Sequence, residues 1–555
     1  MAGTWQGLVN QPPFHTSTMQ LLTDGRVMVQ EEATAHWHAL TPDNQGSYVN
    51  GTWSPLADMA FWRRYYASGM LKDGRVILIG GEQSGAGGDT NLGQIYDPVL
   101  DKWDPLPSPP GWPQVGDAAC TVFPDGRFMI GALLSGECTT YDPSTNSWSP
   151  GGSQPVRTNE ETWILLADHT ILTVECFPPF HSQKYIISSN TWKDEGAVPV
   201  PLVDPVMSEI GPAMLMYNGK VICFGAADSG GHGKTAIYTP PTHPTGTGVW
   251  TAGPNIPKVG GQTMVCNDCP AALLPNGSVL VASAPFLFNN WGSPISFFEY
   301  DPFTNTLTQA STPPNHVAQL YWSRFILLPT GQVLFSPSSN NVQCYTPVGG
   351  PEEHWRPTIS AVIRHGTPTV TDYYVLKGTQ LNGLSQANTY GDDCYAATNY
   401  PLVRLHNVDT KEVHYCRTYD FSTMGVATGH SLQSVRFTTQ GVPHGHYDLC
   451  VVANGISSDC VSFCHHKPRK QCGCSTDCCC REVCGDTCCE EEAMIAPEIL
   501  ELKRQMNSLH RNFYSLASRI KIEEPEREPK RSHKDEDDEK RNKEKDKKED
   551  KKRRE

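Results

Sequence analysis

The side chains best suited to bind a cation or a polar ligand are four acids that recur along the first half of the chain. Each stands eight or nine residues before a short turn of the Asp-Gly type or a weaker copy of it. Carboxylates that lie close together raise one another's pKa or recruit a cation, and Ca²⁺ prefers oxygen ligands. We therefore expect them to bind Ca²⁺, a sugar or another polar ligand; the alternative is that they are solvated in an open channel. The four acids are Asp117, Glu160, Glu209 and Asp268.

A second group of residues capable of chemistry is a run of cysteines near the C-terminus. Nine of the 20 cysteines fall within residues 464–489, where large apolar side chains are almost absent. Such a segment needs cross-links to hold a structure. Three chemistries remain open, namely thiolate binding of Zn or Cu, disulfides between chains, and palmitoylation. The metal ligands would be Cys472, Cys474, Cys478, Cys479, Cys480, Cys484, Cys488 and Cys489.

An internal repeat provides the elements that must position the four acids. A turn such as Asp24-Gly25 or Asp73-Gly74, followed by a short β-branched run, occurs seven times at steps of 43 to 58 residues. An apolar stretch precedes each turn, and a Tyr-Asp-Pro-like turn and a Trp follow most of them. This period is typical of kelch repeats, in which each unit is a four-stranded sheet. Residues 1–355 are therefore predicted to form a seven-bladed β-propeller, closed by an N-terminal strand in the last blade.

The innermost strand of each predicted blade begins at the position eight or nine residues before its turn. All these positions lie on one face of a propeller, so the four acids should converge there. Two other repeats place Arg64 and Trp322 at this position, and we expect both to line the ligand site.

After residue 355 the repeated turn pattern no longer occurs. Residues 356–463 hold short alternating runs and an Asn-Gly hairpin, which suggests an Ig-like β-sandwich. The all-β part is followed by a Cys-rich segment (464–492), a short coiled-coil helix (497–521) and a disordered charged tail (523–555). Apolar residues at steps of 3 and 4 between residues 499 and 520 form a heptad seam, which predicts a dimer or a trimer. A lone helix folded back on the sandwich is the alternative.

Four short stretches stand out after the repeats, namely GTQLNGLS at 378–385, YGDD at 390–393, NYP at 399–401 and TMGVATG at 423–429. Bacterial kelch-repeat proteins of unassigned activity share such stretches, and the chain resembles these proteins most closely. Over residues 1 to about 463, the order of domains also resembles the galactose oxidase family of copper radical oxidases. In that family two tyrosines and two histidines bind copper, and one tyrosine is cross-linked to a cysteine.

Matched onto this chain, the two tyrosines fall on Tyr65 and Tyr321, which the resemblance would make the catalytic residues of an oxidase. The position of the cross-linking cysteine is taken by His15 or Thr16, and the histidine after the second tyrosine is replaced by Trp322. These losses argue against radical chemistry. A simpler metal site of His15, Tyr65, Tyr321 and His430 remains an alternative.

Charge and composition narrow the function further. The net charge of −15 resides in the first 522 residues, because the tail is neutral, and an acidic body disfavours nucleic acid. No apolar run is long enough to span a membrane, and the absence of a signal peptide favours a cytoplasmic protein. We predict a non-catalytic, oligomeric binding or structural protein that self-associates through residues 499–520 and takes a polar ligand, a glycan or a protein partner. A copper-dependent oxidase with an altered site is the alternative.

Overall fold

The computed structural model describes residues 3–204, 206–226, 231–287, 290–365, 373–390 and 396–465. Throughout these residues the regular structure is antiparallel β-sheet, with two 3-10 turns, η1 (Leu320–Trp322) and η2 (Glu353–Trp355). No helix in this part of the chain has the length and apolar character needed to cross a bilayer. The prediction of an all-β fold is confirmed for these residues, whereas residues 466–555, with the predicted coiled coil and most of the Cys-rich segment, lie outside them.

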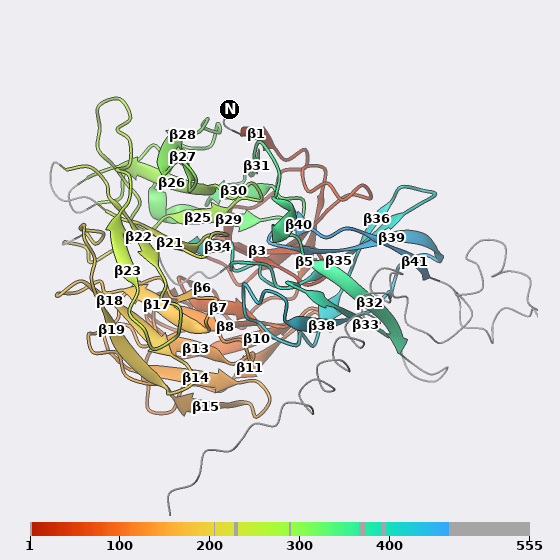
Figure 1. The fold of residues 1–555 in the computed structure, drawn as a ribbon, viewed down its shortest axis with the longest axis horizontal. Coiled ribbons are helices and arrows are strands. Elements are labelled where there is room, and N and C mark those ends of the chain that lie inside the picture. Colours follow the sequence, from red (N-terminus) through yellow and green to blue (C-terminus); the bar gives the residue numbers. More distant parts are fainter. Residues whose placement is uncertain are drawn as a thin grey trace, which may run out of the picture. The chain divides into compact units, whose positions relative to one another are not determined.

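Seven sheets in the described residues hold the predicted turns, each between the first two strands of one sheet (Figure 1); six of these sheets have four antiparallel strands, and the other has four such strands joined by two more. The strands, sheet by sheet, are β2 (Thr16–Leu21), β3 (Val27–Glu31), β4 (Trp37–Thr41) and β5 (Thr52–Leu56); β7 (Ala67–Met70), β8 (Val76–Ile79), β10 (Gly93–Asp97) and β11 (Lys102–Leu106); β12 (Cys120–Val122), β13 (Phe128–Gly131), β14 (Cys138–Asp142) and β15 (Ser147–Pro150); β16 (Ile164–Leu165), β17 (Thr170–Val174), β18 (His181–Ile186) and β19 (Thr191–Ala197); β20 (Ala213–Leu215), β21 (Val221–Phe224), β22 (Thr235–Thr239) and β23 (Val249–Ala252); β25 (Pro270–Leu273), β26 (Val279–Pro285), β27 (Ser296–Asp301) and β28 (Thr306–Gln309); and β29 (Ser323–Leu327), β30 (Val333–Pro337), β31 (Gln343–Thr346) and β1 (Thr4–Gly7). Short strands β6 (Arg63–Arg64) and β9 (Gln83–Ser84) pair with each other, and β24 (Met264–Val265) pairs with β26.

The Asp-Gly turns form because the aspartate caps them. Asp24 Oδ1 accepts a hydrogen bond from the Arg26 backbone N–H at 3.1 Å, and Asp24 Oδ2 accepts one from Arg26 Nε at 2.8 Å. Gly25 has a φ of 82°, a backbone conformation that favours glycine. Asp73 and Arg75 repeat the same pattern. This chemistry is local, so the sequence alone could locate these turns.

The predicted Tyr and Trp residues join the third and fourth strands of a sheet and link neighbouring sheets. Tyr141 on β14 donates a hydrogen bond to Asn146 at 2.8 Å, and its ring centroid lies 5.2 Å from that of Trp148 on β15. Trp148 Nε1 in turn donates to the carbonyl of Pro107, which follows the last strand of the preceding sheet. Trp103 makes the equivalent bond one sheet earlier. The same residues therefore close one sheet and attach it to the next.

The first strands of the seven sheets form a ring. Neighbouring first strands contact each other at β7 and β12, at β16 and β20, and from β20 through β25 to β29. Strand β2 contacts β29, and Gln20 on β2 donates to Ser68 on β7 at 2.9 Å. The N-terminal strand β1 pairs with β31, from Thr4↔Thr346 to Gly7↔Gln343. The first and last segments of the ring thus share one sheet, as the sequence predicted.

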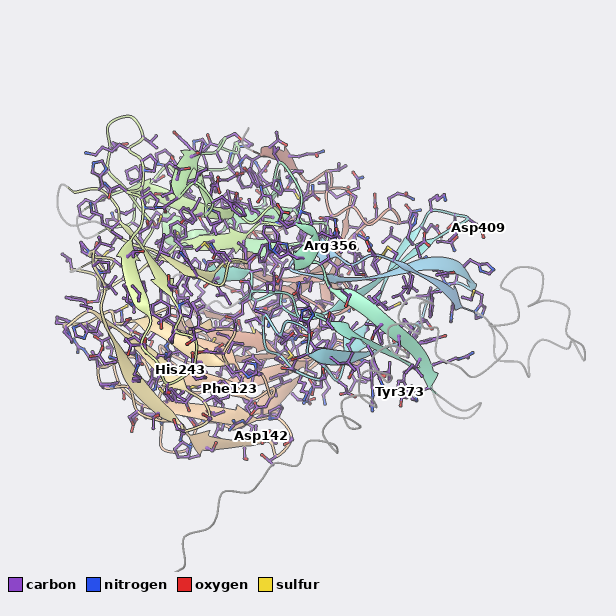
Figure 2. The ribbon with its side chains drawn as sticks, viewed as in Figure 1. Phe123, Asp142, His243, Arg356, Tyr373 and Asp409 are labelled. Atoms are coloured by element: carbon purple, nitrogen blue, oxygen red, sulfur yellow. A yellow bond between two sulfur atoms is a disulfide. The ribbon has the colours of Figure 1, made fainter. Side chains whose placement is uncertain are left out.

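Two further sheets follow the ring and pack against each other. One contains β32 (Thr358–His365), β33 (Tyr373–Thr379), β38 (Leu432–Phe437) and β37 (Thr418–Tyr419); the other contains β36 (Val413–Cys416), β35 (Leu402–Asn407), β39 (Gly445–Ala453), β40 (Ile456–Ser457) and β41 (Val461–His465). Their apolar faces meet, since the ring of Phe463 lies 5.1 Å from Tyr374 and 6.1 Å from Phe437. Figure 2 shows Tyr373 and Asp409 in this part of the molecule and Phe123 and Asp142 in the sheet of β12–β15. A disulfide between Cys450 and Cys460, which the sequence analysis did not predict, joins β39 to the segment before β41.

One segment between β33 and β35 leaves these two sheets and enters the ring. Its strand β34 (Asn388–Tyr390) pairs with β25. Asn388 Oδ1 accepts a hydrogen bond from the Leu327 backbone N–H at 2.7 Å, and Gln386 Oε1 accepts one from the Leu165 N–H at 3.1 Å. The segment therefore bonds to the first strands of three sheets, β16, β25 and β29. The sequence analysis did not predict this insertion.

Candidate functional site

Three of the four predicted acids come together where the first strands begin, an end of the ring that we call the mouth. Glu160 precedes β16, Glu209 precedes β20 and Asp268 precedes β25, each by two to four residues. Each offers one carboxylate oxygen, and these oxygens lie within 4.8 Å of one another. Glu209 and Asp268 are buried, whereas Glu160 is partly exposed. We call these three residues the acidic triad.

The three carboxyls interact strongly because they are close together and shielded from water. Burial raises the pKa of Glu209 well above its usual range, and the carboxylates of Asp268 and Glu160 raise it further. Burial also raises the pKa of the neighbouring Cys176 thiol, and Glu161 and Glu160 add to that rise. Three carboxyls this close repel one another when all are ionised, and a metal cation between them would offset that repulsion.

Hydrogen bonds between neighbouring sheets hold the backbone of the triad in place. The Asp268 N–H donates to the carbonyl of Ile210 at 3.1 Å, and Asn159 Nδ2 donates to the carbonyl of Ser208 at 3.0 Å. Asp268 and Ser208 adopt φ angles of 49° and 62°, in the left-handed region. The residues beside each acid are thus fixed by the adjoining sheet.

An aromatic wall stands beside the triad, and Trp291 connects the two. Trp291 Nε1 donates a hydrogen bond to Asp268 Oδ2 at 2.5 Å. The Trp291 ring centroid lies 4.7 Å from that of Tyr321, which lies 6.3 Å from Tyr65 and 5.5 Å from Trp322. These four residues form the aromatic wall. Trp322 is 38% exposed, so its ring is open to a ligand.

Two arginines adjoin the aromatic wall, and neither extends freely into the mouth. The Arg324 guanidinium lies 5.9 Å from the Tyr65 ring centroid. Burial raises the pKa of Tyr65, and the positive charge of Arg324 opposes that rise. Arg64, which the sequence placed in the ligand site, forms an ion pair with Glu32 at 2.5 Å. The structure thus pairs Arg64 with a carboxylate that the sequence analysis did not select.

The residues around Tyr65 and Tyr321 do not fit the copper site that the family resemblance implies. Cu(II) sites in proteins use imidazole or thiolate ligands. His15 is exposed, and Trp322 occupies the position after Tyr321. The cation beside Tyr65 is the guanidinium of Arg324, which disfavours a second positive charge there. We therefore derive no reaction step through copper.

The structure does not bring the remaining predicted residues into the triad. Asp117 is buried three residues before β12, outside the group of oxygens that the triad forms. His430 is exposed on the loop before β38, and in that loop the Met424 N–H donates to the carbonyl of Pro124 at 2.8 Å. Pro124 follows β12, whereas Asp117 precedes it, so this loop contacts the end of the ring opposite the mouth. His430 therefore does not lie beside Tyr65. The segment that enters the ring is instead the one that contains β34.

The sequence analysis missed Trp291 and Glu32. Trp291 lies between β26 and β27, outside the repeated Tyr–Trp position, and a tryptophan out of that register was the available signal. Glu32 directly follows β3, and nothing in its local sequence distinguishes it from other acids.

Comparison with known proteins gives one curated relative. The kelch-like protein terF of Aspergillus terreus is 32% identical over 123 residues, which is 22% of this chain and 26% of that protein. A fungal alcohol oxidase of the AA5 family in complex with copper has a TM-score of 0.49 at 14% identity, covering 84% of this chain and 100% of that chain. A streptogramin B lyase has a TM-score of 0.42 at 12% identity, covering 62% of this chain and 98% of that chain. No family model matches the chain.

The matched segment spans about a quarter of the curated relative. Over these 123 residues the chain is similar to a kelch-like protein, which agrees with the predicted resemblance to kelch-repeat proteins.

Proposed function

We propose that the protein is a non-catalytic binding protein whose mouth takes a polyhydroxylated ligand such as a glycan. In this proposal the ring is a seven-bladed kelch propeller, and the two packed sheets that follow are an Ig-like domain. The seven sheets of the ring and the pairing of β1 with β31 support this architecture. Self-association through residues 499–520, which the heptad seam indicates, would join several mouths in one particle and increase avidity.

The observation that carries this proposal is the acidic triad beside the aromatic wall. Carboxylates accept strong hydrogen bonds from hydroxyl groups. Aromatic faces offer a large apolar surface on which the C–H face of a sugar ring can pack. Trp291 belongs to the wall and bonds to Asp268, so one ligand could contact both surfaces.

A glycan panel, followed by calorimetry of the best ligand on the full-length protein, tests the proposal. Trp322→Ala should weaken binding about tenfold or more, because it removes the exposed ring of the wall. Phe303→Ala is the matched control, since Phe303 is 71% exposed on the hairpin between β27 and β28. A panel without any binder, or an equal loss in both variants, would contradict the proposal.

A second candidate is a copper-dependent oxidase of the galactose oxidase type with an altered site. The Tyr65–Tyr321 pair favours it, because these two phenols meet at the mouth. The test is peroxide release from galactose and small primary alcohols after incubation with Cu(II), in the wild type and in Tyr65→Phe and Tyr321→Phe. Copper-dependent peroxide that both variants lose would support the oxidase, and its absence in the wild type would exclude it.

A further inference from the structure

We infer that the acidic triad holds a divalent cation of the oxygen-preferring class, Ca²⁺, and that this cation presents open coordination positions to the hydroxyl groups of a ligand. The inference rests on the proposed function, because it states how the same mouth would take a polyhydroxylated molecule.

The spacing of the triad suits such an ion. With Ca–O distances of about 2.4 Å, two oxygens on opposite sides of the ion lie roughly 5 Å apart, and adjacent ones lie closer. The three triad oxygens lie within 4.8 Å of one another, so one ion could contact all of them. Ca²⁺ takes about six to eight oxygen ligands. Three carboxylates therefore leave positions for water or for the hydroxyls of a ligand.

Glu209 supplies an independent indication of a ligand. Its side chain is more than nine-tenths buried, with an exposed fraction of 7%. Glu209 Oε2 is buried and receives no hydrogen bond from any donor in the described residues. Buried polar atoms in proteins normally have a partner, and those without one point to an ion or a water. A cation between the three acids would provide that partner.

The charges around the triad also favour a cation. Three carboxyls lie together there, and Glu161 directly follows Glu160 in the chain. Ca²⁺ would offset the repulsion between the three triad carboxylates.

Trp291 makes the site measurable by spectroscopy. Tb³⁺ replaces Ca²⁺ in oxygen sites, and its emission increases when a nearby indole is excited. The Trp291 indole is hydrogen-bonded to Asp268, so an ion in the triad would lie next to it. Residues 523–555 contain many acids but no tryptophan, so ions bound to that segment would not be excited through an indole of their own.

The experiment titrates the full-length protein with Tb³⁺ under indole excitation and then adds Ca²⁺ as a competitor. We expect saturable emission that Ca²⁺ reverses. Glu209→Gln and Glu160→Gln should weaken this signal about tenfold or more, and should abolish any rise in melting temperature with Ca²⁺. Glu137→Gln, on the exposed turn between β13 and β14, is the control and should behave as the wild type. Trp291→Phe should lose the emission but keep the Ca²⁺-dependent melting shift.

Emission that is unchanged in both triad variants, or a wild type whose melting temperature ignores Ca²⁺, would overturn the inference. Circular dichroism checks the fold of Glu209→Gln, and Glu160→Gln, at a partly exposed position, serves as the second variant. If a glycan binds and EDTA has no effect on its affinity, the inference fails and the proposed function stands. If the triad binds Tb³⁺ but no glycan in the panel binds the protein, the cation site stands and the proposed function fails.

Discussion

Trp291 donates its indole N–H to the Asp268 carboxylate at 2.5 Å, and this bond joins the aromatic wall to the acidic triad. Asp268 is only 2% exposed. Hydrogen bonds to a carboxylate are stronger in such a buried environment than in water. The same indole packs on Tyr321 at 4.7 Å. Trp291 therefore holds the acidic triad and the aromatic wall in a fixed position relative to each other.

Removing the Trp291 donor should destabilise the protein. Trp291→Phe keeps an aromatic ring against Tyr321 but leaves Asp268 without its indole partner, which costs about 1.5–3 kcal/mol for a bond to a charged group. We expect a lower melting temperature by circular dichroism. Trp322→Phe, at the exposed end of the wall, is the comparison and should change the melting temperature less. Equal melting temperatures for the two variants would show that the bond contributes nothing.

Glu161 should make the protein less stable as the pH rises. Burial raises the pKa of Glu161 to about 8, although Gln154 and Trp163 donate hydrogen bonds that lower it. Because the pKa of the folded state exceeds the ordinary value of 4.5, the stabilising contribution is complete below 4.5 and is lost as the pH rises towards 8. Glu161→Gln cannot ionise, so its melting temperature should fall less over this range.

Melting curves of the wild type and Glu161→Gln across this pH range provide the measurement. Glu137→Gln, which is exposed, should follow the wild type. Parallel curves for the wild type and Glu161→Gln would mean that Glu161 does not titrate in this range.

Replacing Glu195 should destabilise the protein more than replacing most other acids of the ring. Lys184 Nζ lies 3.0 Å from Glu195 Oε1, and both side chains are fully buried. Burial tends to raise the pKa of Glu195, but hydrogen bonds led by the Gly248 N–H hold it below its usual range. Glu195→Gln leaves the Lys184 charge without its counter-ion, at a cost of about 3–5 kcal/mol, so the melting temperature should fall strongly.

The double variant Lys184→Met with Glu195→Gln is the control for this pair. It removes both charges together and should recover part of the loss. If the single and double variants melt at the same temperature, the pair is not coupled.

Residues 499–520 should make the protein oligomeric. Their apolar side chains recur at steps of 3 and 4 over three heptads, a length at which an isolated helix is marginal and association depends on the seam. Light scattering should give two or three times the protomer mass for the full chain and the protomer mass for a chain ending at residue 465. Leu509→Lys, at the centre of the seam, should return the full chain to a monomer. If both chains are monomeric at micromolar concentration, the predicted coiled coil is wrong.

The parts of the fold that the sequence predicts are those whose chemistry is local. Asp24 caps its own turn through Arg26, two residues away, and Tyr141 bonds to Asn146, five residues away. Such patterns recur in most copies of the repeat and can be counted. The pairing of β34 with β25 is different, because it joins residues far apart in the chain. It is accompanied by a hydrogen bond from the Leu327 N–H to Asn388 inside the ring. No local pattern near Asn388 marks that partner.

The same contrast applies to the site. The acids of the triad were found because their positions could be counted back from the repeated turns. Trp291 has no such register, since it stands in the loop between β26 and β27 and outside the repeated Tyr–Trp position. His430 was selected from a short resemblance, and its position depends on how the loop before β38 meets Pro124. Non-local packing of this kind is not encoded in residue spacing.

The insertion of β34 makes the ring and the sandwich dependent on each other during synthesis. The backbone amides of Leu165 and Leu327 donate to Gln386 and Asn388, respectively. Buried amides without acceptors are costly. A nascent chain of 355 residues therefore already carries all seven repeats but cannot finish the interior of the ring, which must wait until the ribosome has released residues beyond 390. A gene that ends at residue 355 would deliver a ring without the hydrogen bonds that Gln386 and Asn388 supply.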